Sequence, residues 1–155
     1  MALLYYKSII QSKFDYCDIV WGSIGKGYAR KLQILQNRAL RSVMSVNWTV
    51  SSDTVYNTLK VDKLEDRRIK RVLHFMYKIV YDMIPQTVRR HFVFKRYNYS
   101  LRRTEFKRRS ISYYGTKLWN NIMDEIKIMS LSHFKRRLDC DNDIIARSKG
   151  LLLQR

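Results

Sequence analysis

Basic and aromatic side chains are interspersed along one short segment of this 155-residue chain, KRYNYSLRRTEFKRRSISYY, which begins at Lys95. Each Arg or Lys can neutralise one phosphate group, and each Tyr offers a flat face on which a base can stack. Together these two properties are typical of a surface that holds a nucleic-acid strand without reading its sequence. The candidate contact residues are Lys95, Arg96, Tyr97, Tyr99, Arg102, Arg103, Lys107, Arg108, Arg109 and Tyr113.

A plainer interpretation of this segment stays open. A run of charges usually forms a solvated face, and the aromatic rings could simply fix a loop to the core. A second basic run, EDRRIKR, contains Arg67, Arg68, Lys70 and Arg71. For at least half of its charges we favour the polar side of an amphipathic helix, where acids and bases pair at helical spacing.

No group of residues in this sequence predicts catalysis. There is no glycine-rich phosphate-binding loop, no nucleophile elbow and no His-Glu-x-x-His motif. Asp139, Asp141 and Asp143 alternate as at the start of a calcium-binding loop. That loop requires Gly at its sixth position and Glu at its twelfth, where this chain has Ile144 and Gly150. We therefore predict no catalytic residue, no metal site and no cofactor, and an isolated chain that is not an enzyme.

The charge of the chain indicates what kind of partner it has. There are 31 Lys and Arg against 13 Asp and Glu, a formal net charge of +18. Residues 61–138 carry 20 of these bases and 7 of these acids, so they supply +13 of the total. Such an imbalance favours a polyanionic partner, nucleic acid before a membrane surface. No apolar run approaches the roughly 20 residues of a membrane span, and Cys17 and Cys140 are predicted to be reduced thiols. We expect an intracellular protein, nuclear or cytoplasmic.

Helical periodicity dominates the apolar pattern, and the single Pro and five Gly suit helices with short connections. We predict an all-α or mainly α fold of about five to six helices, with a basic irregular segment near residues 88–112. Residues 1–138 are expected to form one helical domain, and the tail at 139–155 is of mixed character that is compatible with disorder. The buried stripe predicted for the helix YARKLQILQNRALRSVM contains Leu32, Leu35, Ala39, Leu40 and Val43. That of the strongest helix, which Pro85 should stop, contains Leu64, Ile69, Val72, Leu73, Met76, Ile79, Val80 and Met83.

Five pieces of the sequence follow one another in an order found in a known family. They are LYYKSIIQSKFDYCDIVWG, KLQILQNRALRSVM, LKVDKLEDRRIKRVLHFMYKIV, YNYSLRR and YYGTKLWNNIMDEIKIMSLSHFKRRL. In this order, from Leu4 to Leu138, they resemble the region downstream of the catalytic palm in reverse transcriptases of non-LTR retrotransposons, the jockey-like long interspersed elements.

The resemblance implies the thumb end and C-terminal extension of an RNA-directed DNA polymerase, helical and lying against template and primer. Arg102 and Arg103 match the basic residues of the family's fourth motif, and Trp119 with Asn120 matches a Trp-Asn pair in its fifth. Trp21 and Trp119 are expected to be structural anchors, because a Trp near a helix end is usually buried. The aromatic-x-Asp-Asp signature of the palm is missing, which implies a fragment without polymerase activity. RNA, DNA and the upstream polymerase body are the implied partners, and no membrane is.

Two other interpretations stay open beside this one. The chain could be a basic helical interaction module that docks on an acidic protein partner, and the apolar helix at residues 3–21 could then be half of an interface. Alternatively, it could be a non-functional translated remnant of a mobile element.

Overall fold

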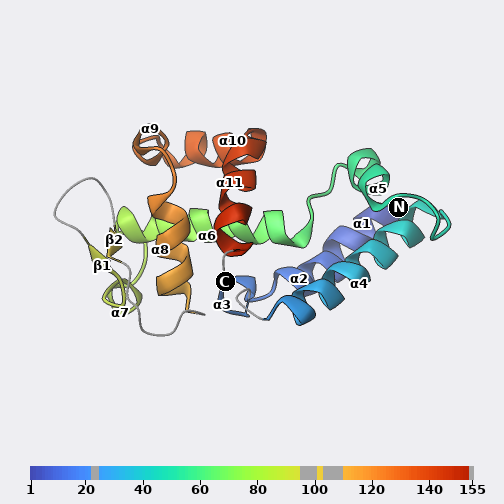
Figure 1. Ribbon diagram of the computed structural model, residues 1–155, viewed down its shortest axis with the longest axis horizontal. Helices are drawn as coiled ribbons and strands as arrows, with labels where there is room; N and C mark the ends of the chain where they lie inside the picture. Colours follow the sequence, from blue (N-terminus) through green and yellow to red (C-terminus); the bar gives the residue numbers. More distant parts are fainter. Residues whose placement is uncertain (22–24, 95–100, 103–109, 154–155) are drawn as a thin grey trace. The chain divides into compact units, whose positions relative to one another are not determined.

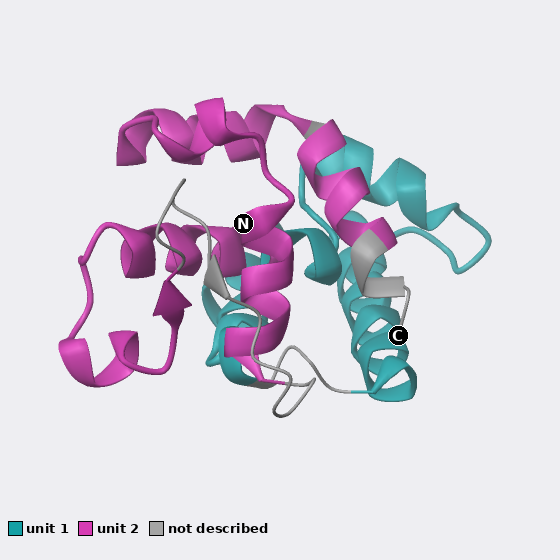
Figure 2. Ribbon diagram, turned by 60° about the vertical axis from the view of Figure 1, so that its left-hand side comes forward, with its two compact units in different colours: residues 1–68 teal, residues 69–155 magenta. Residues whose placement is uncertain are grey.

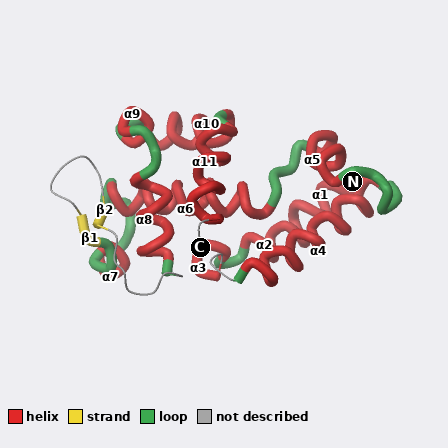
Figure 3. The backbone as a smooth tube through the Cα atoms, in the orientation of Figure 1, coloured by secondary structure: helices red, strands yellow, loops and turns green. Residues whose placement is uncertain are grey.

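The computed structural model describes residues 1–21, 25–94, 101–102 and 110–153. Helices make up most of this part of the chain, and the only strand residues in it form one short hairpin (Figures 1 and 3). The mainly α fold class predicted from the periodicity is therefore confirmed. The chain divides into two compact units, residues 1–68 and 69–155, coloured teal and magenta in Figure 2, where we had expected one domain over residues 1–138.

The first unit begins with an almost continuous helical run. α1 (Ala2–Tyr5) leads through a π-helical stretch, η1 (Tyr6–Gln11), into α2 (Ser12–Asp15). The run stops at Tyr16, which is extended, and Cys17 has a φ of 50°, in a region that a helix cannot include. α3 (Asp18–Trp21) follows this break. The helix predicted over residues 3–21 is thus interrupted near its end.

Two further helices complete the first unit. α4 (Lys26–Met44) lies alongside η1, and α5 (Ser52–Leu59) packs against α4 (Figure 1). Both end at a residue in the left-handed region, Ser45 after α4 and Lys60 after α5. The buried core of this unit consists of Tyr6, Leu40, Val55, Tyr56 and Val61.

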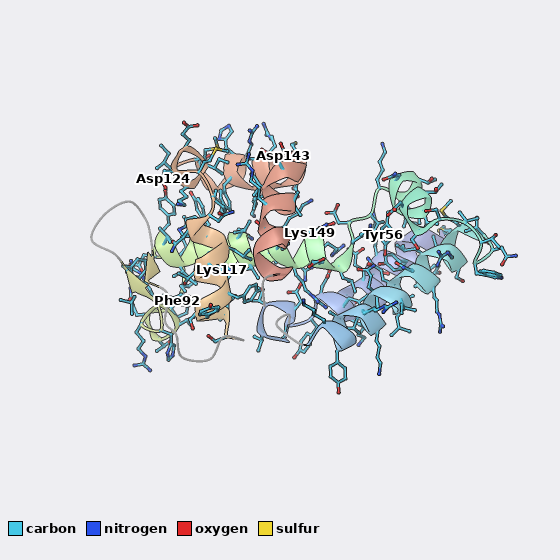
Figure 4. All side chains as sticks on the ribbon, viewed as in Figure 1. Tyr56, Phe92, Lys117, Asp124, Asp143 and Lys149 are labelled. Atoms are coloured by element: carbon cyan, nitrogen blue, oxygen red, sulfur yellow. The ribbon has the colours of Figure 1, made fainter. Side chains whose placement is uncertain are left out.

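Gln36 lies at the centre of this core, with 0% of its surface exposed. Its amide Nε2 donates to the Tyr6 hydroxyl and to the main-chain oxygen of Asp62, both at 3.1 Å. Its Oε1 accepts from the Tyr56 hydroxyl at 2.9 Å and from the Leu64 amide at 3.2 Å. One side chain of α4 therefore joins η1, α5 and the start of α6. Figure 4 labels Tyr56, the α5 member of these contacts. We call these contacts the Gln36 network.

Gln33, one turn earlier on α4, reinforces the Gln36 network. Its Nε2 donates to Gln36 Oε1 at 2.8 Å and to the Tyr56 hydroxyl at 2.6 Å, and its Oε1 accepts from the Leu64 amide at 3.2 Å. The two glutamines thereby satisfy the first amide of α6, which has no partner within its own helix. Burial raises the pKa of the Tyr6 and Tyr56 hydroxyls, so both stay protonated at neutral pH, Tyr6 as an acceptor from Gln36 and Tyr56 as a donor to it.

α6 (Leu64–Val80) is the longest element of the second unit, although its first turn belongs to the first. It ends where Asp82 takes a φ of 56°, and Pro85 then precedes α7 (Gln86–Arg89). Strands β1 (Val93–Phe94) and β2 (Leu101–Arg102) form an antiparallel pair. The remaining helices are α8 (Ile111–Asn120), α9 (Asp124–Lys127), α10 (Leu131–Cys140) and α11 (Asn142–Leu153).

An aromatic cluster from three helices forms the centre of the second unit. Tyr77 of α6, Trp119 of α8 and Phe134 of α10 pack against one another, with ring centroids 4.8 to 6.3 Å apart. Trp119 and Phe134 are fully buried. The Tyr77 hydroxyl donates to the Met129 oxygen at 2.7 Å, and that of Tyr81, one turn later, donates to the Lys127 oxygen at 2.8 Å. Carbonyls at the end of α9 thus obtain partners from α6.

α8 and α6 approach each other closely at Gly115. A Cβ atom placed on this residue would lie 2.7 Å from Sδ of Met76, a buried side chain of α6. Glycine is a poor helix former, and at this position the absence of a side chain allows the two helices to touch.

Several sequence predictions differ from the structure in detail. More helical segments are present than the five to six expected, because the run at residues 2–21 and the stretch after Ser110 are each split. Leu35 is 50% exposed, because α4 turns the amide of Gln36 towards the core in its place. Met83 is 52% exposed, because α6 ends before it. The tail contains a helix, α11, whose Ile144 and Ile145 are buried.

Candidate nucleic-acid interface

Most residues of the predicted contact segment lie outside the described part of the chain. These are Lys95, Arg96, Tyr97, Tyr99, Arg103, Lys107, Arg108 and Arg109. Arg102 is in β2, where its main chain pairs with Val93, and Tyr113 is in the first turn of α8, half-buried. Of the two tryptophans predicted as anchors, Trp119 is fully buried in α8, and Trp21 is the last residue of α3, described by its backbone alone.

Several described residues lie beside the segment in the chain. Phe94 of β1 pairs with Leu101 of β2. Ser110 precedes α8, and its hydroxyl accepts from the Tyr113 amide at 3.4 Å, as an N-terminal cap does. Arg89 of α7 lies over the Phe94 ring, 4.7 Å from its centroid. The described residues that flank the basic stretch therefore belong to β1, β2 and the N-terminus of α8.

A second group of bases lies where α10 packs on α6. Lys70 Nζ is 3.4 Å from Asp139 Oδ1, and this ion pair compensates one of the charges in EDRRIKR. His74 lies one turn further along α6 and Lys78 two turns further. The charges of Lys135 of α10 and of Lys78 both act on the His74 imidazole. His74 Nε2 is buried and has no hydrogen-bond partner among the described residues. This side of the second unit is therefore positive, and the imidazole is held among like charges.

Replacing His74 by Gln is expected to weaken the pH dependence of stability below neutrality. Burial, with Lys135 and Lys78 nearby, lowers the pKa of His74 below its ordinary value. Between the lowered pKa and about pH 6.5, the unfolded chain binds a proton that the folded chain does not. Wild-type stability should therefore fall as the pH drops through this window, and the variant should lose this contribution. Urea unfolding at a series of pH values measures the difference.

Substitutions of α10 test the stated cause of this pH dependence. Lys135→Gln should reduce the slope of stability against pH, because it removes a charge that disfavours the imidazolium. Arg136→Gln removes a charge from the next position and serves as the matched control. Equal slopes for the wild type and His74→Gln would contradict the assignment.

Arg67, in the other half of EDRRIKR, forms a half-buried ion pair with Asp15 of α2. Arg68 is buried as well. Arg67 and Lys70 thus have acids as partners, but these acids lie on α2 and α10 and not at helical spacing within α6, as we had expected.

The described part of the chain contains no group of three or more His, Cys, Asp or Glu side chains that could hold a metal ion. A recess in the second unit, between α9 and α11 and lined by Ile126, Ile144 and Arg147 among others, has room for about one water molecule. Across the described residues, no helix is both long and apolar enough to cross a membrane.

Fold and surface together define a small, strongly basic, mainly α-helical protein whose candidate site is a binding surface. Comparison with protein-family models, with curated proteins and with solved structures gives no match to this chain.

Proposed function

We propose that this chain binds nucleic acid, as a C-terminal segment of a retrotransposon RNA-directed DNA polymerase that lacks the catalytic palm. The observation that carries the proposal is the surplus of 18 positive charges, which internal ion pairs cannot compensate. At least six acids of the described residues pair with a Lys or Arg of the chain itself, among them Asp15, Asp53 and Asp139. The bases that remain need negative charge from outside, and a phosphate backbone supplies it at regular spacing.

The order of the five sequence motifs supports the more specific part of the proposal. In the resembled family this region lies beside template and primer, so RNA and DNA are the partners that we propose. The basic stretch at residues 95–109 is its principal contact segment. A protein with such a role works in the nucleus or cytoplasm.

Binding should depend steeply on salt and little on sequence, because phosphate contacts dominate it. Fluorescence anisotropy with labelled duplex DNA, single-stranded DNA and RNA, between 50 and 200 mM salt, measures the slope of log affinity against log salt. For six or more phosphate contacts the affinity should fall by about a thousandfold or more over this range. Absence of binding at low salt, or binding that ignores salt, would overturn the proposal.

Charge removal then tests the contact segment itself. Replacing Arg102, Arg103, Arg108 and Arg109 by Gln should weaken binding far more than replacing four exposed bases elsewhere. The matched control carries Lys60→Gln, Arg90→Gln, Arg136→Gln and Arg147→Gln, all at exposed positions. Equal losses in the two variants would mean that diffuse charge is sufficient and that residues 95–109 have no special role.

Exposed apolar side chains in the first unit favour a second candidate, an interaction module that docks on a protein partner such as the polymerase body. Leu4, Tyr5 and Ile9 of the first helical run are each more than half exposed. Apolar side chains gathered in this way are typical of protein interfaces. If neither RNA nor DNA binds at low salt, this candidate replaces the first.

A further inference from the structure

α4 (Lys26–Met44) differs from the other long helix of the chain in having bases and no acids. Its sequence, KGYARKLQILQNRALRSVM, contains five Lys and Arg and not one Asp or Glu. α6, by comparison, carries Glu65 and Asp66 in its first turn. No charge within α4 can therefore compensate its bases, and they depend on other elements for partners.

Only some of these bases find partners. Arg41 is used within the first unit, where its guanidinium donates to the main-chain oxygen of Val50 at 3.0 Å and to the Ser52 hydroxyl at 2.9 Å. Arg30 and Arg38 form no hydrogen bond or ion pair with any described residue, and Lys31 has only the face of the Tyr28 ring, 5.7 Å from its centroid. Three positive charges of α4, those of Arg30, Lys31 and Arg38, thus have no acid as a partner within the described structure.

The three bases share the exposed side of the helix. Lys31 and Arg38 are seven residues apart, which is almost two full turns, so they lie in line along α4 with a separation of about 10 Å. Arg30 flanks this line, and all three side chains are exposed. The opposite side of α4 bears Gln36 and Leu40, which are fully buried. The exposed bases therefore lie on a helix that the core holds in place.

The spacing suits a phosphate backbone. Successive nucleotides of one strand rise by about 3.4 Å along a duplex, so about 10 Å corresponds to three steps. Tyr28, 69% exposed, lies at the edge of the same face and could stack on an unpaired base.

A membrane surface suits this face less well. Helices that lie on membranes keep a continuous apolar face apart from their charged one. On α4 the buried apolar side chains belong to the core of the first unit, and the exposed Ile34 and Leu35 lie on either side of the line from Lys31 to Arg38. The charges therefore occupy the middle of the exposed face, where they would meet a phosphate backbone first.

We propose that the exposed face of α4 is a second nucleic-acid contact, in which Arg30, Lys31 and Arg38 each hold a backbone phosphate. The proposal rests on the proposed function, because it requires that the chain bind nucleic acid. It adds a contact surface on the first unit to the one at residues 95–109.

The test compares two variants of the full chain that lose the same charge. One carries Arg30→Gln, Lys31→Gln and Arg38→Gln, and the control carries Lys60→Gln, Arg136→Gln and Arg147→Gln. Anisotropy titrations use duplex DNA, single-stranded DNA and RNA probes at several salt concentrations, and circular dichroism checks the helix content. The α4 variant should lose about tenfold or more in affinity, and its salt slope on duplex DNA should fall by about 2 to 3, since each phosphate contact contributes about 0.9.

The outcomes separate the two proposals. If the wild type does not bind in a salt-dependent manner, the proposed function fails and this inference fails with it. If the wild type binds and both variants lose the same affinity, only the role of α4 is overturned. If phosphatidylserine vesicles bind the wild type more tightly than the nucleic-acid probes and lose binding in the α4 variant, the face belongs to lipid headgroups and the inference is overturned.

A measurement on the unaltered chain covers the case in which the α4 variant does not fold. Acetylation by an amine reagent, followed by mass spectrometry, reports the accessibility of each lysine. Saturating nucleic acid should protect Lys31 several-fold and leave Lys60 unchanged. Equal reactivity of Lys31 with and without nucleic acid would overturn the inference.

Discussion

Replacing Trp119 by Ala is expected to lower the free energy of unfolding by about 3–5 kcal/mol, the usual range for removing a fully buried Trp. Trp119 has 0% of its surface exposed and packs edge-on against Tyr77 and obliquely against Phe134. The cavity left behind would be lined by rings from α6 and α10, which cannot collapse without moving whole helices. Chemical denaturation followed by circular dichroism measures the loss.

The chain offers a matched control for this substitution. Trp48 is 80% exposed, so Trp48→Ala should change stability by less than about 0.5 kcal/mol. Trp119→Phe, which keeps an aromatic ring in the cluster, should cost less than Trp119→Ala. A loss for Trp119→Ala no larger than that for Trp48→Ala would mean that the aromatic cluster is not the centre of the second unit.

Replacing Gln36 by Leu should cost about 2–4 kcal/mol, although the new side chain is apolar, of similar size and placed in a core. The change leaves the Tyr6 hydroxyl and the Asp62 oxygen without their amide donor, and it removes one acceptor from Tyr56 and Leu64. Buried polar groups that lose a partner carry their full desolvation cost. Gln33 still accepts from Leu64, which limits the loss.

Urea unfolding of Gln36→Leu should be compared with that of Gln86→Leu. Gln86 is exposed and bonds only to Asp82 nearby on the surface, so its replacement should change stability by less than about 0.5 kcal/mol. If Gln36→Leu were as stable as the wild type, hydrophobic burial would outweigh the hydrogen bonds of the Gln36 network.

The strongest periodic patterns were sufficient to predict the main helices. In α6, the buried side chains Leu64, Ile69, Val72, Leu73, Met76 and Ile79 belong to the predicted stripe, because apolar residues at a continuous 3.6-residue repeat fall on one side of a helix. Tyr77, which is also buried, was not included in it. Helix ends were less predictable. The breaks at Cys17 and Asp82 require a positive φ at residues that are not Gly. A Cys or an Asp in the sequence does not by itself predict such a backbone conformation.

Interactions between distant segments could not be predicted from the sequence. The stripe predicted for α4 included Leu35 and left out Gln36, although of these two residues it is Gln36 that is buried. Its burial depends on polar partners 20 to 30 residues away in the chain, which no local pattern contains. A signal was nevertheless present, since Gln33, Gln36 and Asn37 place three amides on one side of a helix that otherwise buries apolar groups.

Of the candidate contact residues, too, some could be predicted from the sequence and others could not. The composition identified the basic stretch at residues 95–109, and its role stays a prediction. The bases of α4 were overlooked in the sequence, because a base outside an apolar stripe is ordinary for any amphipathic helix. What distinguishes them is the lack of partners for Arg30 and Arg38 among the described residues, and partners can be assigned only in three dimensions.

The Gln36 network also limits how this sequence can diverge. Two of its groups, the Leu64 amide and the Asp62 oxygen, belong to the main chain, and no substitution can remove a peptide group. The tyrosines at positions 6 and 56 could each become Phe at a smaller cost, because Gln36 Nε2 still donates to the Asp62 oxygen and Gln36 Oε1 still accepts from the Leu64 amide. Position 36 has no such freedom, since one side chain there must donate and accept at once. We therefore expect an amide at position 36 to be conserved in distant homologues more strictly than the apolar residues around it.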